Sequence, residues 1–148
     1  MRWVLLAALL TLSVLGGCSR FVILNDALTA AEHNDLGVVY ERQGQTELAA
    51  REYRRALKRD SRFTRARVNL GNLAAARGDW DEAEQIYRRA LRDAPTDADA
   101  LNNLAVALLR QGRLDEAEAQ ALRAVTAAGA ADSIPRATLT EVRTARGR

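Results

Sequence analysis

The chain repeats a pattern at a fixed period, the spacing that takes Leu36 to Leu70 and Leu70 to Leu104, and this repeat constrains its fold more than any other feature. The repeat is seen when three segments are aligned without gaps: NDLGVVYERQGQTELAAREYRRAL, VNLGNLAAARGDWDEAEQIYRRAL and NNLAVALLRQGRLDEAEAQALRAV. Five columns keep the spacing in all copies: Leu36, Leu70 and Leu104; Gly37, Gly71 and Ala105; Gly44, Gly78 and Gly112; Ala49, Ala83 and Ala117; Ala56, Ala90 and Ala124. Such a period is typical of arrays in which each unit packs on its neighbours.

Each copy contains two stretches with helical patterning, separated by a glycine. In the first copy, Thr29–Glu32 forms a capping box that begins a helix, and Gly44 suits the left-handed residue that ends it. Ala49 and Ala56 then share one face of a second helix. Because a single helix pair cannot bury its apolar face, we expect three pairs to stack into an all-α array.

Composition agrees with a helical core built from small side chains. Of the 148 residues, 48% are hydrophobic but 5% are aromatic, so Ala and Leu must supply most of the core. Two prolines and nine glycines leave long uninterrupted stretches. One cysteine and one histidine argue against an internal disulfide, a zinc cluster and histidine-based catalysis. The net charge of +3 gives no argument for nucleic acid.

The copies resemble the tetratricopeptide repeat, a family whose columns of Leu-Gly, Tyr, Ala, an aromatic residue, Ala and Pro recur here. The matches are Leu36, Gly37, Tyr40, Ala49, Tyr53 and Ala56 in the first copy, and Leu70, Gly71, Ala83, Tyr87, Ala90 and Pro95 in the second. The resemblance implies an α-solenoid of three helix-turn-helix repeats over 30–63, 64–97 and 98–131. The third copy departs from the family pattern, because Ala121 stands where an aromatic residue is usual. Tyr53 and Tyr87 are expected to fill space between neighbouring pairs.

Residues 132–148 are predicted to form a C-terminal capping helix with a basic tail. Ser133 is expected to cap this helix, and Pro135 suits its first turn. Ile134, Leu139 and Val142 are expected to cover the last repeat. This segment would close the apolar end of the array.

The first seventeen residues have the features of a secretory signal peptide. Arg2 precedes an apolar run from Trp3 to Val14, and small residues end the segment. As a helix the run spans about 18 Å, too short for a bilayer core of ~30 Å. We therefore expect residues 1–17 to be removed.

The sequence LGGC, which ends at Cys18, resembles the lipobox of bacterial lipoproteins, where a peptidase cuts before a cysteine that carries lipid. An ordinary secretory signal followed by an unrelated cysteine is the alternative. The resemblance implies covalent lipid on Cys18 and a lipidated tether over 18–29. Because Ser19 follows the cysteine where Asp would favour the inner membrane, it also implies location at the periplasmic face of the outer membrane.

The tetratricopeptide resemblance places ligand contacts on the concave face lined by the first helix of each pair. The matching positions are Asn34, Val38, Glu41, Asn69, Asn72, Asp99, Asn103 and Val106. An asparagine amide can both donate to and accept from an extended peptide backbone, although asparagine is also the family's default at several of these positions. The clamp that this family uses for C-terminal carboxylates needs basic residues, so Asp99 and Asn103 disfavour that ligand.

A basic stretch follows the first of these helices. Between Arg51 and Arg67 lie eight basic residues against Glu52 and Asp60. Four of them are predicted to share a stripe at helical spacing: Arg51, Arg55, Lys58 and Arg62. A solvated outer face is one interpretation of this basic face, and contact with anionic lipid or an acidic partner is the other.

The sequence predicts no enzyme. It contains no Ser–His–Asp set, no H-E-x-x-H and no phosphate-binding glycine loop. His33 stands where the repeat usually places Trp, which favours a packing role, and Trp80 is expected to be half-buried.

The sequence therefore predicts a non-catalytic protein–protein interaction adaptor that supports an envelope complex. The expected partners are another envelope protein or peptide and the membrane, with no nucleic acid, small-molecule substrate, metal or cofactor apart from the lipid on Cys18. Two alternatives remain open. One is an accessory subunit on an envelope enzyme or on a polysaccharide-export or pilus assembly machine, and the other is a self-associating scaffold.

Overall fold

The computed structural model describes residues 26–129 and 132–147. The predicted signal peptide over 1–17 and the lipidation of Cys18 lie outside the described residues, as does most of the predicted tether over 18–29.

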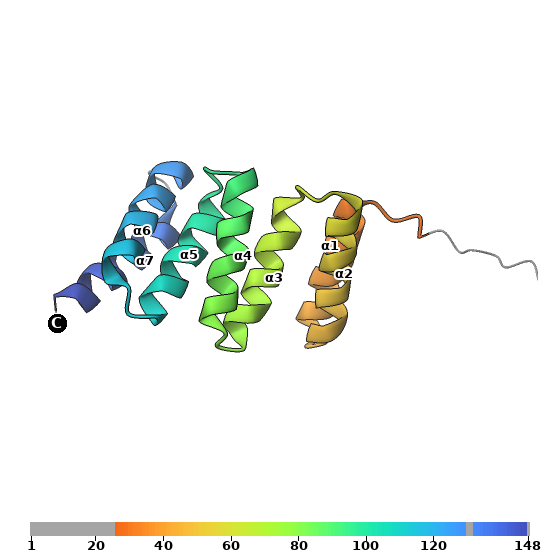
Figure 1. The fold of residues 1–148 in the computed structure, drawn as a ribbon, viewed down its shortest axis with the longest axis horizontal. Coiled ribbons are helices and arrows are strands. Elements are labelled where there is room, and N and C mark those ends of the chain that lie inside the picture. The colour runs from red at the N-terminus through yellow and green to blue at the C-terminus, as the bar shows by residue number, and fades with distance from the viewer. Residues whose placement is uncertain (1–25, 130–131, 148) are drawn as a thin grey trace, which may run out of the picture.

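The described residues form seven α-helices and no strand. The helices are α1 (Ala30–Arg42), α2 (Thr46–Arg59), α3 (Thr64–Ala76), α4 (Trp80–Asp93), α5 (Ala98–Arg110), α6 (Leu114–Ala128) and α7 (Ser133–Arg146). Each helix packs on the next in the chain, and α5 also contacts α3 and α7. The helices therefore stand side by side in succession along the long axis of the molecule (Figure 1). The prediction of an all-α solenoid is confirmed.

Local signals in the sequence set the ends of the helices. At the start of α1 the Thr29 hydroxyl accepts from the Glu32 N–H at 3.2 Å, while the Thr29 N–H donates to the Glu32 carboxylate at 2.7 Å. The predicted capping box is therefore present. Gly44, Gly78 and Gly112 follow the first three odd-numbered helices with φ of 73°, 81° and 76°, the left-handed region that glycine adopts without strain.

A glycine and a tyrosine set the distance between the two helices of each of the first two pairs. A Cβ placed on Gly37 would lie 2.4 Å from Cε1 of Tyr53, and one on Gly71 would lie 2.4 Å from Cε1 of Tyr87. Both rings are buried, at 0% and 2% exposure. As predicted, each ring belongs to a core cluster that includes residues of the next pair, and it also lies against the glycine of its own pair.

The third pair replaces both members of this contact. Ala105 stands in the glycine column and Ala121 in the tyrosine column, and both are fully buried. A methyl group in the glycine column is compatible with the fold here because no ring faces it. The two substitutions are therefore structurally coupled.

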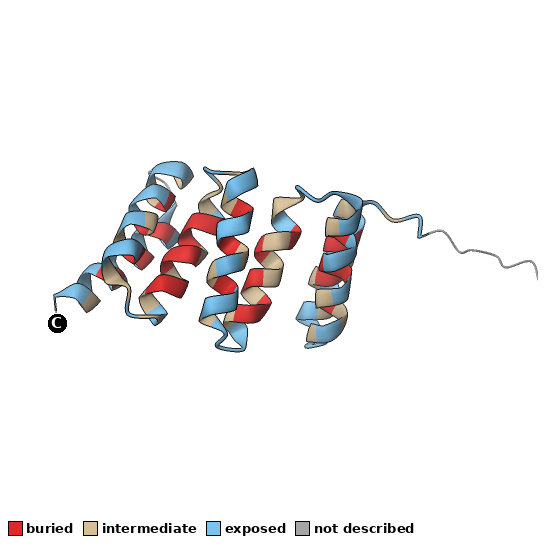
Figure 2. Ribbon diagram, in the orientation of Figure 1, coloured by how far each residue is buried: buried red, intermediate tan, exposed pale blue. Residues whose placement is uncertain are grey.

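Buried side chains recur in every helix pair and do not gather at one centre (Figure 2). One cluster joins α2 and α3 through Ala49, Tyr53, Ala56, Ala66 and Leu73. A second cluster extends from α3 to α7 and ends at Val142. Within the described residues no helix is long and apolar enough to span a membrane.

The last helix, α7, takes the place of the first helix of a fourth pair. Its buried residues Pro135, Thr138 and Val142 stand one repeat period after three buried leucines of α5: Leu101, Leu104 and Leu108. Two predictions about this segment are wrong. Ile134 does not cover the last repeat, because it is 65% exposed. The helix is capped by Asp132, whose carboxylate accepts from the Ile134 N–H at 2.9 Å, and Ser133 is its first residue.

Ion pairs fix α7 to α6. The Glu118 carboxylate accepts from Arg143 at 2.8 Å and from Arg146 at 2.6 Å. These two hydrogen bonds lower the pKa of Glu118. The pairs lie at the surface, so they orient the capping helix more than they stabilise it.

Changing Gly71 to alanine tests the glycine–tyrosine contact. The new methyl would clash with the Tyr87 ring, so Gly71→Ala should lower the free energy of unfolding by about 1–3 kcal/mol, although the same change in an open helix is stabilising. Tyr87→Ala should cost about 3–5 kcal/mol by leaving a cavity. The double variant restores the pairing found in the third repeat and should cost less than the sum of the singles in urea unfolding. Strict additivity would contradict the proposed contact.

The buried tyrosines predict a loss of stability in alkali. Burial raises the pKa of Tyr87 above its ordinary value of 10.0, and burial together with the hydrogen bond to Glu41 raises that of Tyr53. A phenol whose pKa is higher in the folded chain stabilises the fold below about pH 10, and this contribution is lost as the pH rises further. The tyrosinate absorbance of Tyr53 and Tyr87 should therefore appear together with the loss of helical circular dichroism. Subtracting the titration of the double variant Tyr53→Phe/Tyr87→Phe isolates the absorbance of these two tyrosines. If their tyrosinate absorbance appeared while the chain was still fully helical, the raised pKa values assigned to them would be refuted.

Candidate functional site

The odd-numbered helices form one continuous face, which we call the inner face: the exposed parts of α1, α3, α5 and α7. Asn69 on α3 donates to the Oδ1 of Asn34 on α1 at 2.9 Å, and Asn103 on α5 donates to the Oδ1 of Asn72 on α3 at 2.9 Å. The α5–α7 contact continues the face to the end of the array. These hydrogen bonds between asparagine side chains link the first helices of successive pairs directly.

Asn72 lies at the centre of this face and keeps hydrogen-bonding capacity. Its Oδ1 accepts from both Asn103 and the Tyr87 hydroxyl, the latter at 2.8 Å. The side chain is half-buried, and within the part of the chain that the structure describes its Nδ2 makes no hydrogen bond. An amide held in place by its oxygen, with its NH₂ group unused, can donate to a peptide carbonyl.

The predicted groove residues differ in how far they are buried and in what they contact. Asn34 is 1% exposed, so the prediction that it contacts a ligand is wrong, and its amide serves the contact with Asn69 instead. Val38 packs against the core cluster of the first pair. Glu41 is exposed and accepts from the Tyr53 hydroxyl at 2.6 Å. The remaining positions are half-buried or exposed on α3 and α5: Asn69, Asn72, Asp99, Asn103 and Val106.

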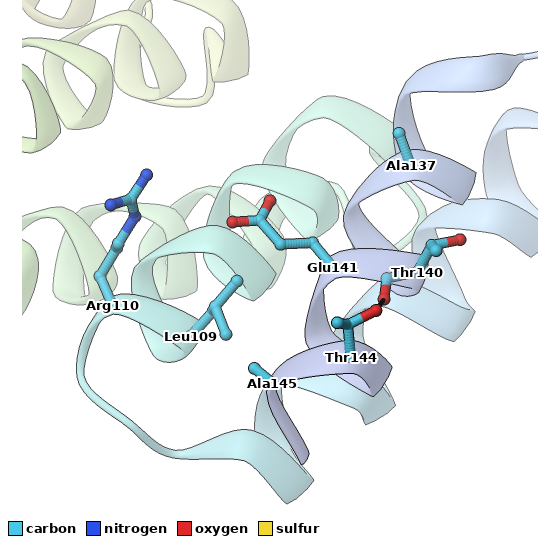
Figure 3. Close-up of a pocket in the computed structure, with 7 residues that line it drawn as sticks. All are labelled: Leu109, Arg110, Ala137, Thr140, Glu141, Thr144 and Ala145. Carbon is cyan, nitrogen blue, oxygen red and sulfur yellow. Dashed lines mark hydrogen bonds between the residues drawn. The ribbon is translucent and has the colours of Figure 1, made fainter. Parts of the chain in front are cut away.

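An open hollow of about 700 Å³ lies between α5 and α7 (Figure 3). Leu109 and Arg110 of α5 line one side, and Ala137, Thr140, Glu141, Thr144 and Ala145 of α7 line the other. The Glu141 side chain extends from α7 across the hollow toward α5 (Figure 3). The hollow therefore offers charges of both signs beside methyl groups.

The α7 residues of this hollow were missed by the sequence analysis, which treated that helix as a cap. The repeat was the available signal, because Ala137 and Thr140 stand one repeat period after Asn103 and Val106. The hydrogen-bonded asparagines of α1, α3 and α5 (Asn34, Asn69, Asn72 and Asn103) form a row of amides. Ala137 has no amide, so this row does not continue onto α7. The buried Asn102 Oδ1 has no hydrogen-bond partner among the described residues, whereas its counterpart Asn34 accepts from Asn69.

Trp80 at the start of α4 contacts Arg110 at the end of α5, where the second and third pairs meet. The Arg110 guanidinium lies 5.6 Å from the centre of the Trp80 ring, within the range of a cation–π contact. Gln111 donates to the Trp80 carbonyl at 3.1 Å. Trp80 is half-buried as predicted, and it holds Arg110 beside the hollow.

The predicted basic face is present in part. Arg51, Arg55 and Lys58 are exposed on α2, where Arg55 donates to Glu52 at 2.8 Å. The prediction that Arg62 continues the same helical stripe is wrong, because α2 ends at Arg59 and Arg62 lies exposed in the connection to α3.

His33 has a packing role, as predicted, and it also forms a hydrogen bond. It is fully buried, with Nδ1 at 2.8 Å from the Glu52 carboxylate. Its Nε2 lies 2.9 Å from an Asp26 oxygen, without hydrogen-bond geometry. The imidazole thus joins the segment before α1 to α2. No group of three His, Cys, Asp or Glu residues suited to a metal ion is present within 26–129 and 132–147.

Comparison with known proteins identifies the array. The tetratricopeptide repeat family profile matches residues 34–98 and 76–133, which together make up more than half of the chain. No curated protein gives a significant sequence match. The first tetratricopeptide domain of Spaghetti (RPAP3), solved with the HSP90 peptide SRMEEVD, is similar to the chain with a TM-score of 0.74 and 17% identity, over 80% of this chain and 94% of that one.

A second solved structure gives the same result. The first tetratricopeptide domain of human RPAP3, determined by NMR, has a TM-score of 0.74 and 17% identity over 80% of this chain and 92% of that one. At this identity the likeness concerns the fold, and the family follows from the profile match. The chain belongs to the tetratricopeptide repeat family.

Proposed function

We propose that this chain is a non-catalytic adaptor, anchored through lipid on Cys18 at the periplasmic face of the outer membrane, whose inner face binds an extended segment of another envelope protein. Its mechanism is localisation: the lipid confines the array to the membrane surface, and the inner face selects the partner. Tetratricopeptide arrays generally act as interaction scaffolds and present extended binding surfaces.

The row of amides on the inner face is the observation that carries the binding half of this proposal. The Asn72 Oδ1 accepts from Asn103 and from the Tyr87 hydroxyl, so the orientation of both amides is set before a ligand arrives. The Nδ2 of Asn72 is available to a peptide carbonyl, and the hollow between α5 and α7 can receive a side chain. Groups fixed in advance lose little conformational entropy when they bind.

The solved Spaghetti (RPAP3) domain supports a peptide as the ligand class. That domain holds the HSP90 peptide SRMEEVD and has the same fold as this chain. The partner of this chain differs in chemistry, because the inner face offers Asp99 and Asn103 where a clamp for a terminal carboxylate would need cations. We therefore propose an internal extended segment as the ligand.

The anchoring half of the proposal is supported by the sequence around Cys18. The LGGC motif directly follows a short apolar run, and Ser19 follows the cysteine. Each buried CH₂ of an acyl chain contributes about 0.8 kcal/mol, so two or three chains hold a protein durably on a membrane.

Cys18→Ser tests the anchor. Without the thiol no lipid can be attached, so the variant should leave the outer-membrane fraction in cell fractionation. Metabolic labelling with a palmitate analogue should mark the native chain and not the variant. The matched control is Ser19→Ala, which alters the adjacent residue and should leave both readouts unchanged. A Cys18→Ser chain that still sediments with the outer membrane would refute the anchor.

A photo-crosslinking amino acid tests the inner face. Placed at Val106 on α5, it should yield an adduct with an envelope protein in living cells, whereas the same group at the exposed Arg92 of α4 should not. Asn72→Ala should reduce the adduct by about tenfold, because it removes the positioned donor. An adduct of two copies of this chain would support the self-associating scaffold, and an adduct from Arg92 alone would place binding elsewhere.

A further inference from the structure

One end of the molecule carries four exposed cations, which we call the basic end: Lys58, Arg59, Arg62 and Arg65. Lys58 and Arg59 close α2, Arg62 lies in the connection, and Arg65 lies in the first turn of α3. Within the described part of the chain none of the four forms an ion pair. The acid nearest in sequence, Asp60, accepts from the Arg62 backbone N–H at 2.9 Å.

These charges are not part of the repeated pattern. Lys58 has a basic counterpart one repeat period later, Arg92. The other three have acidic or neutral counterparts: Asp93, Thr96 and Asp99. The turn between the first two repeats is therefore basic, whereas the equivalent turn between the second and third is not.

The second and third repeats pair two of their arginines with a shared acid. Glu84 on α4 accepts from Arg88 at 2.8 Å and from Arg113 at 2.6 Å, which ties the second pair to the third. Ala50 stands one repeat period before Glu84, so Arg54, the counterpart of Arg88, has no carboxylate one turn earlier in its helix. The first repeat therefore lacks a carboxylate equivalent to Glu84. Positive charge is concentrated on α2 and on the turn after it as a result.

The basic end is also where the chain enters the array. Because the short turn at Gly44 makes α1 and α2 antiparallel, the start of α1 lies beside the end of α2. Figure 1 shows the segment before α1 leaving at the same end of the molecule as the α2–α3 connection. The contact of His33 with Asp26 and Glu52 holds that segment against the first pair.

We propose that the basic end lies on an anionic phospholipid surface and so orients the array on the membrane. This inference rests on the proposed lipid anchor at Cys18. Eight residues lead from Cys18 to Asp26, and even a fully extended chain of this length spans at most about 26–29 Å. The basic end is thus kept within reach of the headgroups, and four cations around a helix end and a turn match a plane of phosphates. Each such cation raises affinity for an anionic membrane by about fivefold.

Lys58 provides a direct probe, because it is the single lysine of the sequence. The full chain, purified from membranes of expressing cells, is placed on vesicles of phosphatidylcholine alone or of phosphatidylcholine with phosphatidylglycerol. An amine-acylating reagent is added, and modification of Lys58 is followed by mass spectrometry of the peptide that contains it. Acylation should be about fivefold slower on the anionic vesicles, and high salt should remove the difference. Equal rates on the two vesicles would overturn the proposal.

Two variants with the same change in net charge separate position from total charge. Arg59→Gln/Arg62→Gln removes two cations of the basic end and should abolish the protection of Lys58. Arg92→Gln/Arg136→Gln removes two exposed cations elsewhere and should leave it intact. Equal effects of the two variants would overturn the proposal. So would protection found in native membranes but not on anionic vesicles, because it would assign the contact to an acidic protein.

Flotation keeps this test distinct from that of the anchor. The native chain should float with neutral vesicles, where lipid alone can hold it. A chain that floats with neutral vesicles without protection of Lys58 on anionic ones contradicts the basic-end proposal and leaves the anchor standing. A chain that fails to float with neutral vesicles contradicts the anchor, and with it the proposed orientation on the membrane.

Discussion

The contact between a glycine and a tyrosine ring governs the geometry of the first two helix pairs. Because Gly37 and Gly71 have no side chain, the rings of Tyr53 and Tyr87 lie directly on the partner helix. The same rings extend into the core shared with the next pair, so the spacing within a pair also fixes the spacing between pairs. The position of the amides on the inner face follows from it, since Asn72 is held by the hydroxyl of Tyr87.

Much of the fold was predictable because the sequence repeats the same pattern of residues at a fixed spacing. The repeated columns of leucine, glycine and alanine gave the number of helix pairs and their turns, and the capping box at Thr29 is a local interaction that needs no tertiary information. The errors came from contacts that no local pattern contains. Ile134 has the hydrophobicity of a core residue, yet it is exposed because α7 turns Pro135, Thr138 and Val142 toward the array.

The candidate site was predictable as a face but not as a set of groups. Family register placed the asparagines on the odd-numbered helices, whereas the burial of Asn34 depends on Asn69, a neighbour on the next repeat that takes up its oxygen. The stripe through Arg62 failed for a similar reason, since helical spacing has no meaning beyond Arg59, where α2 ends. Spacing locates a side chain on an element, and only the neighbouring elements decide whether it remains free.

The position of α7 has a consequence for growth of the array. A stack of similar units offers related contact surfaces at its two ends, and such head-to-tail contacts extend into open filaments unless something stops them. Here α7 repeats the buried positions of α5 on the side that faces the array. Its other exposed positions are mostly polar, including Arg136, Thr140 and Thr144. A second array that stacked on this helix would bury polar groups in place of apolar surface, so α7 opposes head-to-tail polymerisation and favours one finite binding surface per molecule.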